Sequence, residues 1–197
     1  HDALPISNGS TTGVTTGITE LGSVRLLDLD GDGVREIYLD GKDANGRSIT
    51  CAVLYSAGES RPLHLALFDS QSYALGTIKD FEDGKLVLDT EMNILGTYKV
   101  KSVYTLSDNT FAKSTGDIVF DNNTTYVTTS KSITLSNGSL LAKGTKLRFT
   151  STDGSSVIHF VTDGGFTGSI PIVSSGSGWT IGGQPYTSCF TSLPYKN

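Results

Sequence analysis

The stretch LLDLDGDGVREIYLD, residues 26–40, places carboxylate side chains at alternate positions of a short polar segment. Numbered from Asp28, the first, third, fifth and ninth positions are acidic and the seventh is Val34. Ca²⁺ takes about six to eight oxygen ligands, and alternate carboxylates on a tightly curved segment converge on one point. The seventh residue of such a loop adds its backbone carbonyl oxygen. The spacing therefore predicts a Ca²⁺ site whose ligands are Asp28, Asp30, Asp32, Glu36 and the carbonyl oxygen of Val34.

The predicted Ca²⁺ has a structural role in this interpretation. Gly31 and Gly33 permit the sharp curl of the loop, and a bound cation offsets the repulsion between the carboxylates. The other charged neighbours, Arg25 and Arg35, are neither nucleophiles nor bases, which argues against metal-assisted catalysis. The alternative is a solvated hairpin turn without a metal, because Asp-Gly pairs are common in turns. A second acidic segment, DGKDANG at residues 40–46, is expected to be a plain turn.

The acidic loop differs from an EF-hand at the position that matters most. Its twelfth residue is Leu39, where an EF-hand has a bidentate Glu, and the flanking runs SVRLL and EIYL have the pattern of strands. The loop resembles instead the strand-loop-strand calcium sites of FG-GAP and integrin-type repeats, and of extracellular bacterial proteins that carry a DxDGDGxxE stretch. This resemblance implies the same set of calcium ligands.

The chain from Ser23 onward alternates short apolar runs with Gly, Asp and Asn turns, which predicts antiparallel strands joined by hairpins. Residues 1–19 are rich in Gly, Ser and Thr, as expected of a flexible leader. We expect residues 20–121 to form an antiparallel hairpin and meander module that carries the calcium loop. A second series of runs begins after DNNTT and includes TYVTTS, KLRFTS and SVIHFVT. We expect residues 122–197 to form a small closed or nearly closed barrel with a C-terminal tail, because short strands need their edges covered.

The segment LLAKGTKLRFTSTDGSSVIHFVTDGGFTGSIPI, residues 140–172, resembles bacterial Src-homology-3-like domains. Ser169 stands where those domains favour Trp. The predicted fold is therefore mainly β, with the hairpin module followed by a small Src-homology-3-like β-barrel. Such domains in secreted bacterial proteins commonly bind cell-wall peptides, glycans or protein segments. The resemblance rests on Lys143, Gly144, Thr145, Leu147, Asp163, Gly164, Gly168 and Ile170.

Charge divides the chain near residue 122. Residues 1–121 contain 18 Asp and Glu against 10 Lys and Arg, whereas residues 122–197 contain 2 against 5. Gram-positive cell walls are polyanionic and attract cationic surfaces, although the same cations can serve solubility alone. An aromatic platform for a sugar or peptide is a further hypothesis, with packing into the core as its alternative. The candidate ligand-binding residues are Lys131, Lys143, Lys146 and Arg148 in the basic set, and Trp179, Tyr186 and Tyr195 in the aromatic set.

The closing segment GSGWTIGGQPYTSCFTSLPY resembles the tail of uncharacterised secreted proteins of gut Firmicutes that also carry the DLDGDG loop. That resemblance implies an extracellular or cell-surface location in a Gram-positive bacterium. We therefore expect a monomeric binding or adhesion module with a structural Ca²⁺, whose partner is a cell-wall polymer, glycan or peptide. The alternatives are a hydrolase of glycans or wall peptides and a structural spacer within a larger surface protein.

Several classes of function lack support in the sequence. No basic run or stripe indicates nucleic-acid binding, and no apolar stretch is long enough for a transmembrane helix. The sequence predicts no catalytic residues, since no nucleophile has a recognisable base beside it. Cys51 and Cys189 form either one bridge or two buried thiols. The hydrolase alternative would draw its acids from Glu59, Asp80, Glu82 and Asp89.

Overall fold

The computed structural model describes residues 6–7, 11–12, 14–55, 63–121, 123–176 and 178–195. Their regular structure is β-strand apart from one 3₁₀ turn, η1 (Tyr186–Ser188). The mainly β, antiparallel class expected from the sequence is confirmed. No helix among the described residues is long and apolar enough to cross a membrane. The chain forms two compact units: Glu91–Lys101 and the described residues from Thr115 onward make unit 2, and the remainder makes unit 1.

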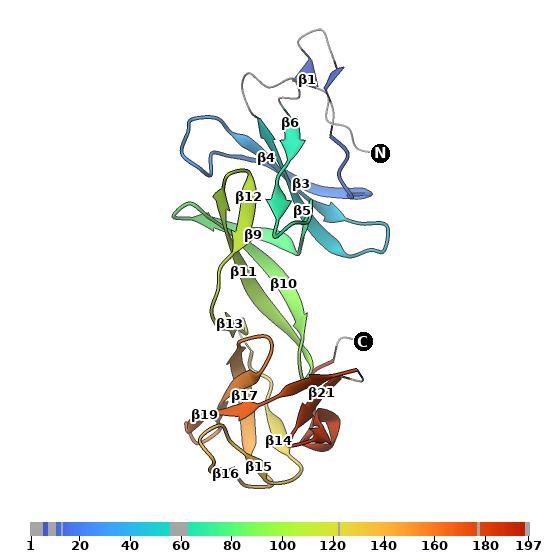
Figure 1. Ribbon diagram of the computed structural model, residues 1–197. Helices are drawn as coiled ribbons and strands as arrows, with labels where there is room; N and C mark the ends of the chain where they lie inside the picture. Colours follow the sequence, from blue (N-terminus) through green and yellow to red (C-terminus); the bar gives the residue numbers. More distant parts are fainter. Residues whose placement is uncertain are drawn as a thin grey trace. The chain divides into compact units, whose positions relative to one another are not determined.

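The first sheet of unit 1 positions the acidic loop. The labelled strands of Figure 1 include β3, β4, β5 and β6, which follow one another in this order in the sheet. Strand β8 also pairs with β5. In the antiparallel β3–β4 ladder Leu27 pairs with Glu36, so residues 28–35 form the connection between the two strands. The strands are β3 (Glu20–Leu27), β4 (Glu36–Lys42), β5 (Ser48–Tyr55), β6 (Leu63–Leu65) and β8 (Ala74–Leu75). A separate short hairpin pairs β1 (Ile6–Ser7) with β2 (Thr11–Thr12).

A second sheet covers one face of the first. Its order is β7-β12-β11-β10-β9, and β12 runs parallel to β7. Tyr38, Ala52 and Leu54 of the first sheet pack with residues of the second, including Leu86 and Phe111, in a common core. This core fixes the start of β4, where Glu36 lies. The strands are β7 (Leu67–Phe68), β9 (Thr77–Glu82), β10 (Lys85–Asn93), β11 (Thr97–Ser107) and β12 (Thr110–Lys113).

The opposite face of the first sheet has its own apolar cluster, which includes Ile18, Leu39 and Cys51. Successive side chains of a strand point to opposite faces, so both faces of β4 and β5 are buried. Asp40 also lies inside β4 and is only 6% exposed. Its Oδ1 accepts hydrogen bonds from Thr50 Oγ1 (2.6 Å) and the Ile78 amide (2.9 Å). The expectation that Asp40 belongs to a turn is wrong, because its carboxylate joins β4 to β5 and β9 instead.

Unit 2 is built on a sheet of order β19-β18-β17-β14-β23, to which β13 adds by pairing with β17. Its core contains Leu147, Phe149, Ile158 and Phe160, which alternate along β17 and β18. The strands of this sheet are β13 (Ile118–Val119), β14 (Val127–Thr129), β17 (Lys146–Thr152), β18 (Val157–Thr162), β19 (Thr167–Pro171) and β23 (Phe190–Thr191).

Two smaller sheets complete unit 2. One pairs β15 (Ile133–Thr134) with β16 (Leu140–Leu141), and the other has the order β20-β21-β22. Among the described residues the strand pairings leave the main sheet open at β19 and β23, so they do not close a barrel. The Src-homology-3-like barrel is therefore not confirmed. The last three strands are β20 (Val173–Ser175), β21 (Gly178–Ile181) and β22 (Gln184–Pro185).

Candidate functional site

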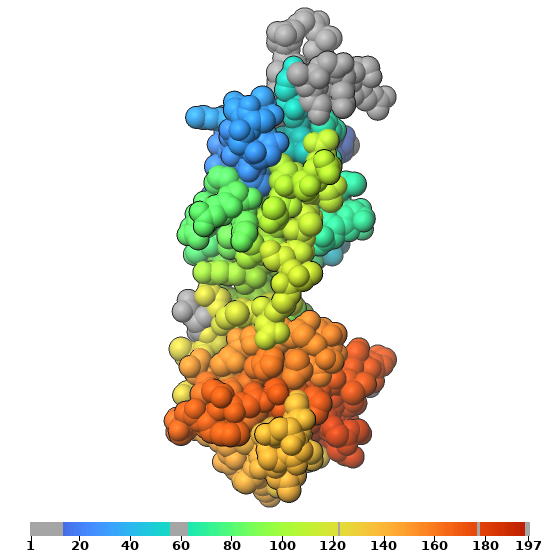
Figure 2. Space-filling model, turned by 60° about the vertical axis from the view of Figure 1, so that its left-hand side comes forward, coloured from blue at the N-terminus to red at the C-terminus, as the bar shows by residue number. Residues whose placement is uncertain are grey.

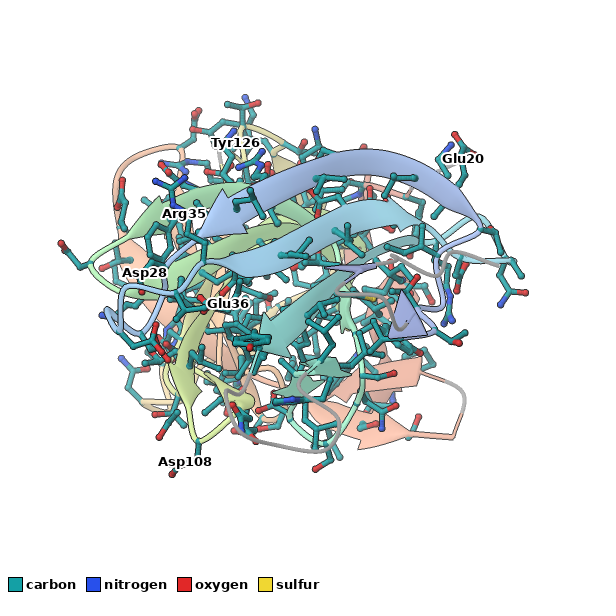
Figure 3. All side chains as sticks on the ribbon, turned by 90° about the horizontal axis from the view of Figure 1, so that it is seen from above. Glu20, Asp28, Arg35, Glu36, Asp108 and Tyr126 are labelled. Carbon is teal, nitrogen blue, oxygen red and sulfur yellow. The ribbon has the colours of Figure 1, made fainter. Side chains whose placement is uncertain are left out.

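The acidic loop occupies one end of the β3–β4 hairpin in unit 1. Asp28, Arg35 and Glu36 lie together at this end, and Glu20 marks the other end (Figure 3). The stretch around residue 30 lies at the surface, as the blue atoms of the space-filling view show (Figure 2). The hairpin register thus brings the two ends of the acidic segment next to each other.

Three of the predicted ligands converge. Asp28, Asp30 and Glu36 each offer a carboxylate oxygen, and these oxygens all lie within 4.8 Å of one another. Ca²⁺–oxygen bonds are about 2.3–2.6 Å long, so two ligands on opposite sides of the ion lie about 4.6–5.2 Å apart. The spacing of the three oxygens fits a single hard cation. Carboxylates are also the ligand type that such a cation prefers.

Backbone amides hold the loop in its curled form. The two carboxylate oxygens of Asp28 accept hydrogen bonds from Gly31 N (2.8 Å) and Gly33 N (3.0 Å). Both glycines have positive φ, 79° and 84°, a conformation that costs glycine little. Each carboxylate oxygen has two lone pairs, so these hydrogen bonds leave acceptor capacity for a cation.

Glu36 is the buried member of the group. Glu36 is only 5% exposed, and its Oε2 accepts a hydrogen bond from the Leu29 amide at 3.0 Å. Burial raises the pKa of the Glu36 carboxyl, and the nearby charges of Asp30 and Asp32 raise it further. A buried carboxylate surrounded by other carboxylates is unfavourable without a counter-charge. A cation at this position would supply that charge.

Tyr38 carries a second buried polar group near the acidic loop, and this group has no hydrogen-bond partner among the described residues. It follows Glu36 by two residues in β4, so the two side chains share a face of the sheet. Tyr38 is 0% exposed, and its buried hydroxyl has no hydrogen-bond partner among the described residues. Burial raises the pKa of Tyr38, as do the charges of Glu36, Asp30 and Asp28. A buried hydroxyl is rarely left unpaired, and a bound cation with its water would give it a partner.

Asp32 and Val34, the other two predicted ligands, are placed differently. Asp32 is exposed, and its Oδ1 accepts a hydrogen bond from the Val34 amide at 2.7 Å. Asp32 is not one of the three residues whose oxygens converge. Sequence reasoning missed Tyr38, although strand alternation places it on the face of Glu36 and could have identified it.

The predicted basic residues cluster in part. Lys146 and Arg148 are two residues apart in β17 and share its outer face, opposite the buried Leu147. Lys143 is exposed in the turn before this strand. Lys131 is half-buried, and its Nζ donates a hydrogen bond to Ser188 Oγ at 2.9 Å.

The three predicted aromatic residues also come from the end of unit 2. Tyr195 and Tyr186 are joined by a hydrogen bond between their hydroxyls at 3.2 Å. Burial raises the pKa of Tyr195 to about 12, and the hydrogen bond with Tyr186 adds to this effect. Trp179 lies in β21, partly buried against the core of unit 2, as does Tyr186. Two of the three residues predicted as an aromatic platform therefore pack against the core, whereas Tyr195 is 53% exposed.

Two of the remaining titratable candidates have local partners, Glu82 is exposed at the end of β9, and one candidate lies outside the described residues. That candidate is Glu59. Asp89 forms an ion pair with Lys79 at 3.7 Å, and Asp80 accepts a hydrogen bond from the Phe81 amide. Cys51 and Cys189 are both free, buried thiols.

Comparisons with known proteins leave the chain without an assigned family. No family model matches it, and searches of curated proteins and of solved structures find no match.

Proposed function

We propose that this chain is an extracellular or cell-surface binding module in which Ca²⁺ clamps the β3–β4 hairpin. The observation that carries the metal site is the convergence of Asp28, Asp30 and Glu36 within 4.8 Å. The buried hydroxyl of Tyr38, which has no hydrogen-bond partner among the described residues, supports it. These residues fit Ca²⁺ because they supply oxygen donors and negative charge at the right spacing. Asp32 and the carbonyl of Val34 are the next ligands in the proposed set.

The proposed role of the cation is structural. It connects Asp28, which directly follows β3, with Glu36, the first residue of β4. It also removes the repulsion between ionised side chains in a loop whose other residues are mostly exposed. The result is a hairpin end that is ordered when Ca²⁺ is bound. Extracellular Ca²⁺ modules of this kind bind the ion with modest affinity, about 10⁻⁴–10⁻³ M.

The binding role is assigned to unit 2, and the Src-homology-3-like identity of residues 122–197 belongs to this proposal. The excess of cations in residues 122–197 supports it, as does the outer face of β17, where Lys146 and Arg148 stand together. A polyanionic wall polymer, a glycan or an acidic wall peptide is the partner that this charge favours.

Calorimetric titration of the chelator-treated chain with Ca²⁺ tests the metal site. We expect saturable heat for the wild type and for Asp108→Asn, and none for Asp30→Asn. Asp108 is a matched control because it is an exposed acid in the β11–β12 turn of the same unit. Its φ is 48°, which Asn tolerates. Equal heats from all three proteins would contradict a site at the loop.

Retention on purified Gram-positive cell wall tests the binding role. We expect retention that weakens as salt rises, because the attraction is electrostatic. Retention that does not depend on salt, or no retention at all, would contradict the assignment.

A further inference from the structure

The surface of unit 2 contains a concavity beside β17, and Arg148 of this strand is one of its lining residues. Its volume is about 480 Å³, within the range of sites for small ligands. It is lined by Phe120, Asn123, Thr124, Tyr126 and Arg148. We call it the Tyr126–Arg148 concavity.

Strand register explains why these two side chains meet. In the antiparallel β14–β17 ladder, Val127 pairs with Leu147, and both are buried. Tyr126 precedes Val127 and Arg148 follows Leu147, so both lie on the outer face, across from each other. Lys146 shares this face, with its Nζ 4.7 Å from the centroid of the Tyr126 ring. Tyr126 is labelled in Figure 3.

The wall of the concavity is held in place by hydrogen bonds of Asn123. Its Nδ2 donates to the Phe149 carbonyl at 2.9 Å, and its Oδ1 accepts from the Thr125 amide at 3.0 Å. Phe120, only 4% exposed, stacks on Tyr98 with ring centroids 4.4 Å apart. The site is thus built on a fixed turn and a packed aromatic pair, which limits the ordering cost of binding.

The electrostatics of the concavity favour an anion. Arg148 lines it, Lys146 stands over the ring of the lining residue Tyr126, and no lining residue is acidic. Among the described residues, neither cation forms an ion pair with a carboxylate. Nη1 of Arg148 donates to the Asn123 carbonyl at 3.4 Å, which is long for a hydrogen bond. The guanidinium therefore keeps donors for the bidentate recognition of a carboxylate or phosphate.

We propose that the Tyr126–Arg148 concavity binds a sugar unit that carries a carboxylate or phosphate group. The anionic group pairs with Arg148 and Lys146, while the hydroxyl of Thr124 and the ring of Tyr126 contact the sugar. This inference rests on the proposed binding role of unit 2, for which it supplies the site and the ligand class. It does not depend on the Ca²⁺ loop of unit 1.

Amide NMR titration of the full chain tests the proposal, with D-glucuronate, glucose 1-phosphate, D-glucose and inorganic phosphate as probes. We expect saturable shifts at Asn123, Tyr126 and Arg148 with at least one anionic sugar, and at least tenfold weaker binding of glucose. The two anionic sugars distinguish a carboxylate from a phosphate as the recognised group. Equal binding of glucose would overturn the role of the anion, and equal binding of inorganic phosphate would overturn the role of the sugar.

Variants locate the site. Arg148→Gln is expected to weaken the anionic sugar at least tenfold, whereas Lys85→Gln, which removes the same charge from an exposed position at the start of β10, changes affinity less than twofold. Equal weakening by both variants would show general charge attraction and overturn the site. Thr124→Trp keeps every cation and fills the concavity from an exposed position. This variant tests the site even if Arg148→Gln does not fold. Unchanged binding by Thr124→Trp would also overturn the proposal.

The cell-wall assay separates this inference from the proposed function. Loss of wall retention in Thr124→Trp, with normal Ca²⁺ binding, supports both. Full retention in that variant overturns the concavity as the wall site and leaves the binding role intact. Sugar binding by a wild-type chain that is not retained on the wall supports the concavity and contradicts the wall as the partner.

Discussion

Two of the hairpin ends that carry acidic groups hold their carboxylates in opposite electrostatic situations. Between β17 and β18, Asp153 accepts hydrogen bonds from the amides of Ser155, Ser156 and Val157. Asp153 also accepts a hydrogen bond from the Ser156 hydroxyl. This bond first, and then the amide bonds, lower the pKa of Asp153 well below its usual range. Between β3 and β4, burial raises the pKa of Glu36 instead.

This difference is the reason why we propose a cation at only one of the two turns. Asp153 is exposed and its charge is stabilised by N–H and O–H donors of its own turn, so it requires nothing further. Glu36 is buried near other carboxylates and accepts an amide hydrogen bond from Leu29. The buried hydroxyl of Tyr38, on the same face of β4, has no partner among the described residues. Sequence composition alone does not separate these cases, because both turns contain Asp and Gly.

Removal of Ca²⁺ is expected to have the largest effect, and only on the β3–β4 hairpin end. A ligand present at a hundred times its dissociation constant stabilises the folded state by about 2.7 kcal/mol. Hydrogen exchange of the β4 amides should therefore accelerate in chelator, while exchange in β17 stays unchanged. In the Asp30→Asn variant the β4 amides should exchange at the faster rate both with Ca²⁺ and with chelator. Equal acceleration in β4 and β17 would remove the contrast between the two turns.

Truncation of Asp153 is expected to have a smaller effect that is independent of Ca²⁺. Asp153→Ala removes acceptors from a turn, a change that typically costs about 1 kcal/mol. Thermal unfolding followed at unit 2 signals should show the same loss with Ca²⁺ and with chelator. A loss that depends on Ca²⁺ would mean that the β17–β18 turn also binds the ion.

Tyr38→Phe tests the role of a single hydroxyl group near the acidic loop. Without Ca²⁺ the change removes a buried hydroxyl that has no described partner, so stability should stay equal or rise by up to about 1 kcal/mol. Ca²⁺ affinity should fall several-fold, since the hydroxyl no longer assists the bound ion or its water. Chemical unfolding and calorimetry measure the two effects. Reduced stability in chelator, with unchanged affinity, would contradict a link between Tyr38 and the metal.

The pH dependence of unit 2 is expected to be the smallest effect. The lowered pKa of Asp153 means that its contribution is present above the unfolded-state value of about 3.9 and is lost as pH falls toward the folded-state value. The side chain is exposed, so solvent screening limits the contribution. Unfolding between pH 5 and pH 2 should lose less stability in Asp153→Asn than in the wild type. Identical pH profiles would contradict the stabilising hydrogen bonds.

Local pattern predicted the strands well. The run EIYL corresponds to the start of β4 (Glu36–Lys42) and SVIHFVT to β18 (Val157–Thr162), because alternation and turn residues are local signals. The convergence of Asp28, Asp30 and Glu36 was also predictable, since all three belong to one short segment. Asp32 and Val34 remain predictions as ligands.

Features that depend on pairing between distant segments were not predictable. Asp40 lies in a strand because Thr50 and the amide of Ile78 satisfy its carboxylate, and neither partner is marked in the local sequence. The meeting of Tyr126 and Arg148 depends on the β14–β17 register. A shift of one residue in that register would have moved one of the two side chains into the core.

Amide NMR of the full chain with Ca²⁺ and then with excess chelator tests the central claim most directly. The account predicts Ca²⁺-dependent shifts confined to residues 28–38, including Tyr38, with slower exchange of the loop amides when the ion is bound. Loop and Tyr38 signals that are identical in Ca²⁺ and in chelator, in an intact β3–β4 hairpin, would contradict it.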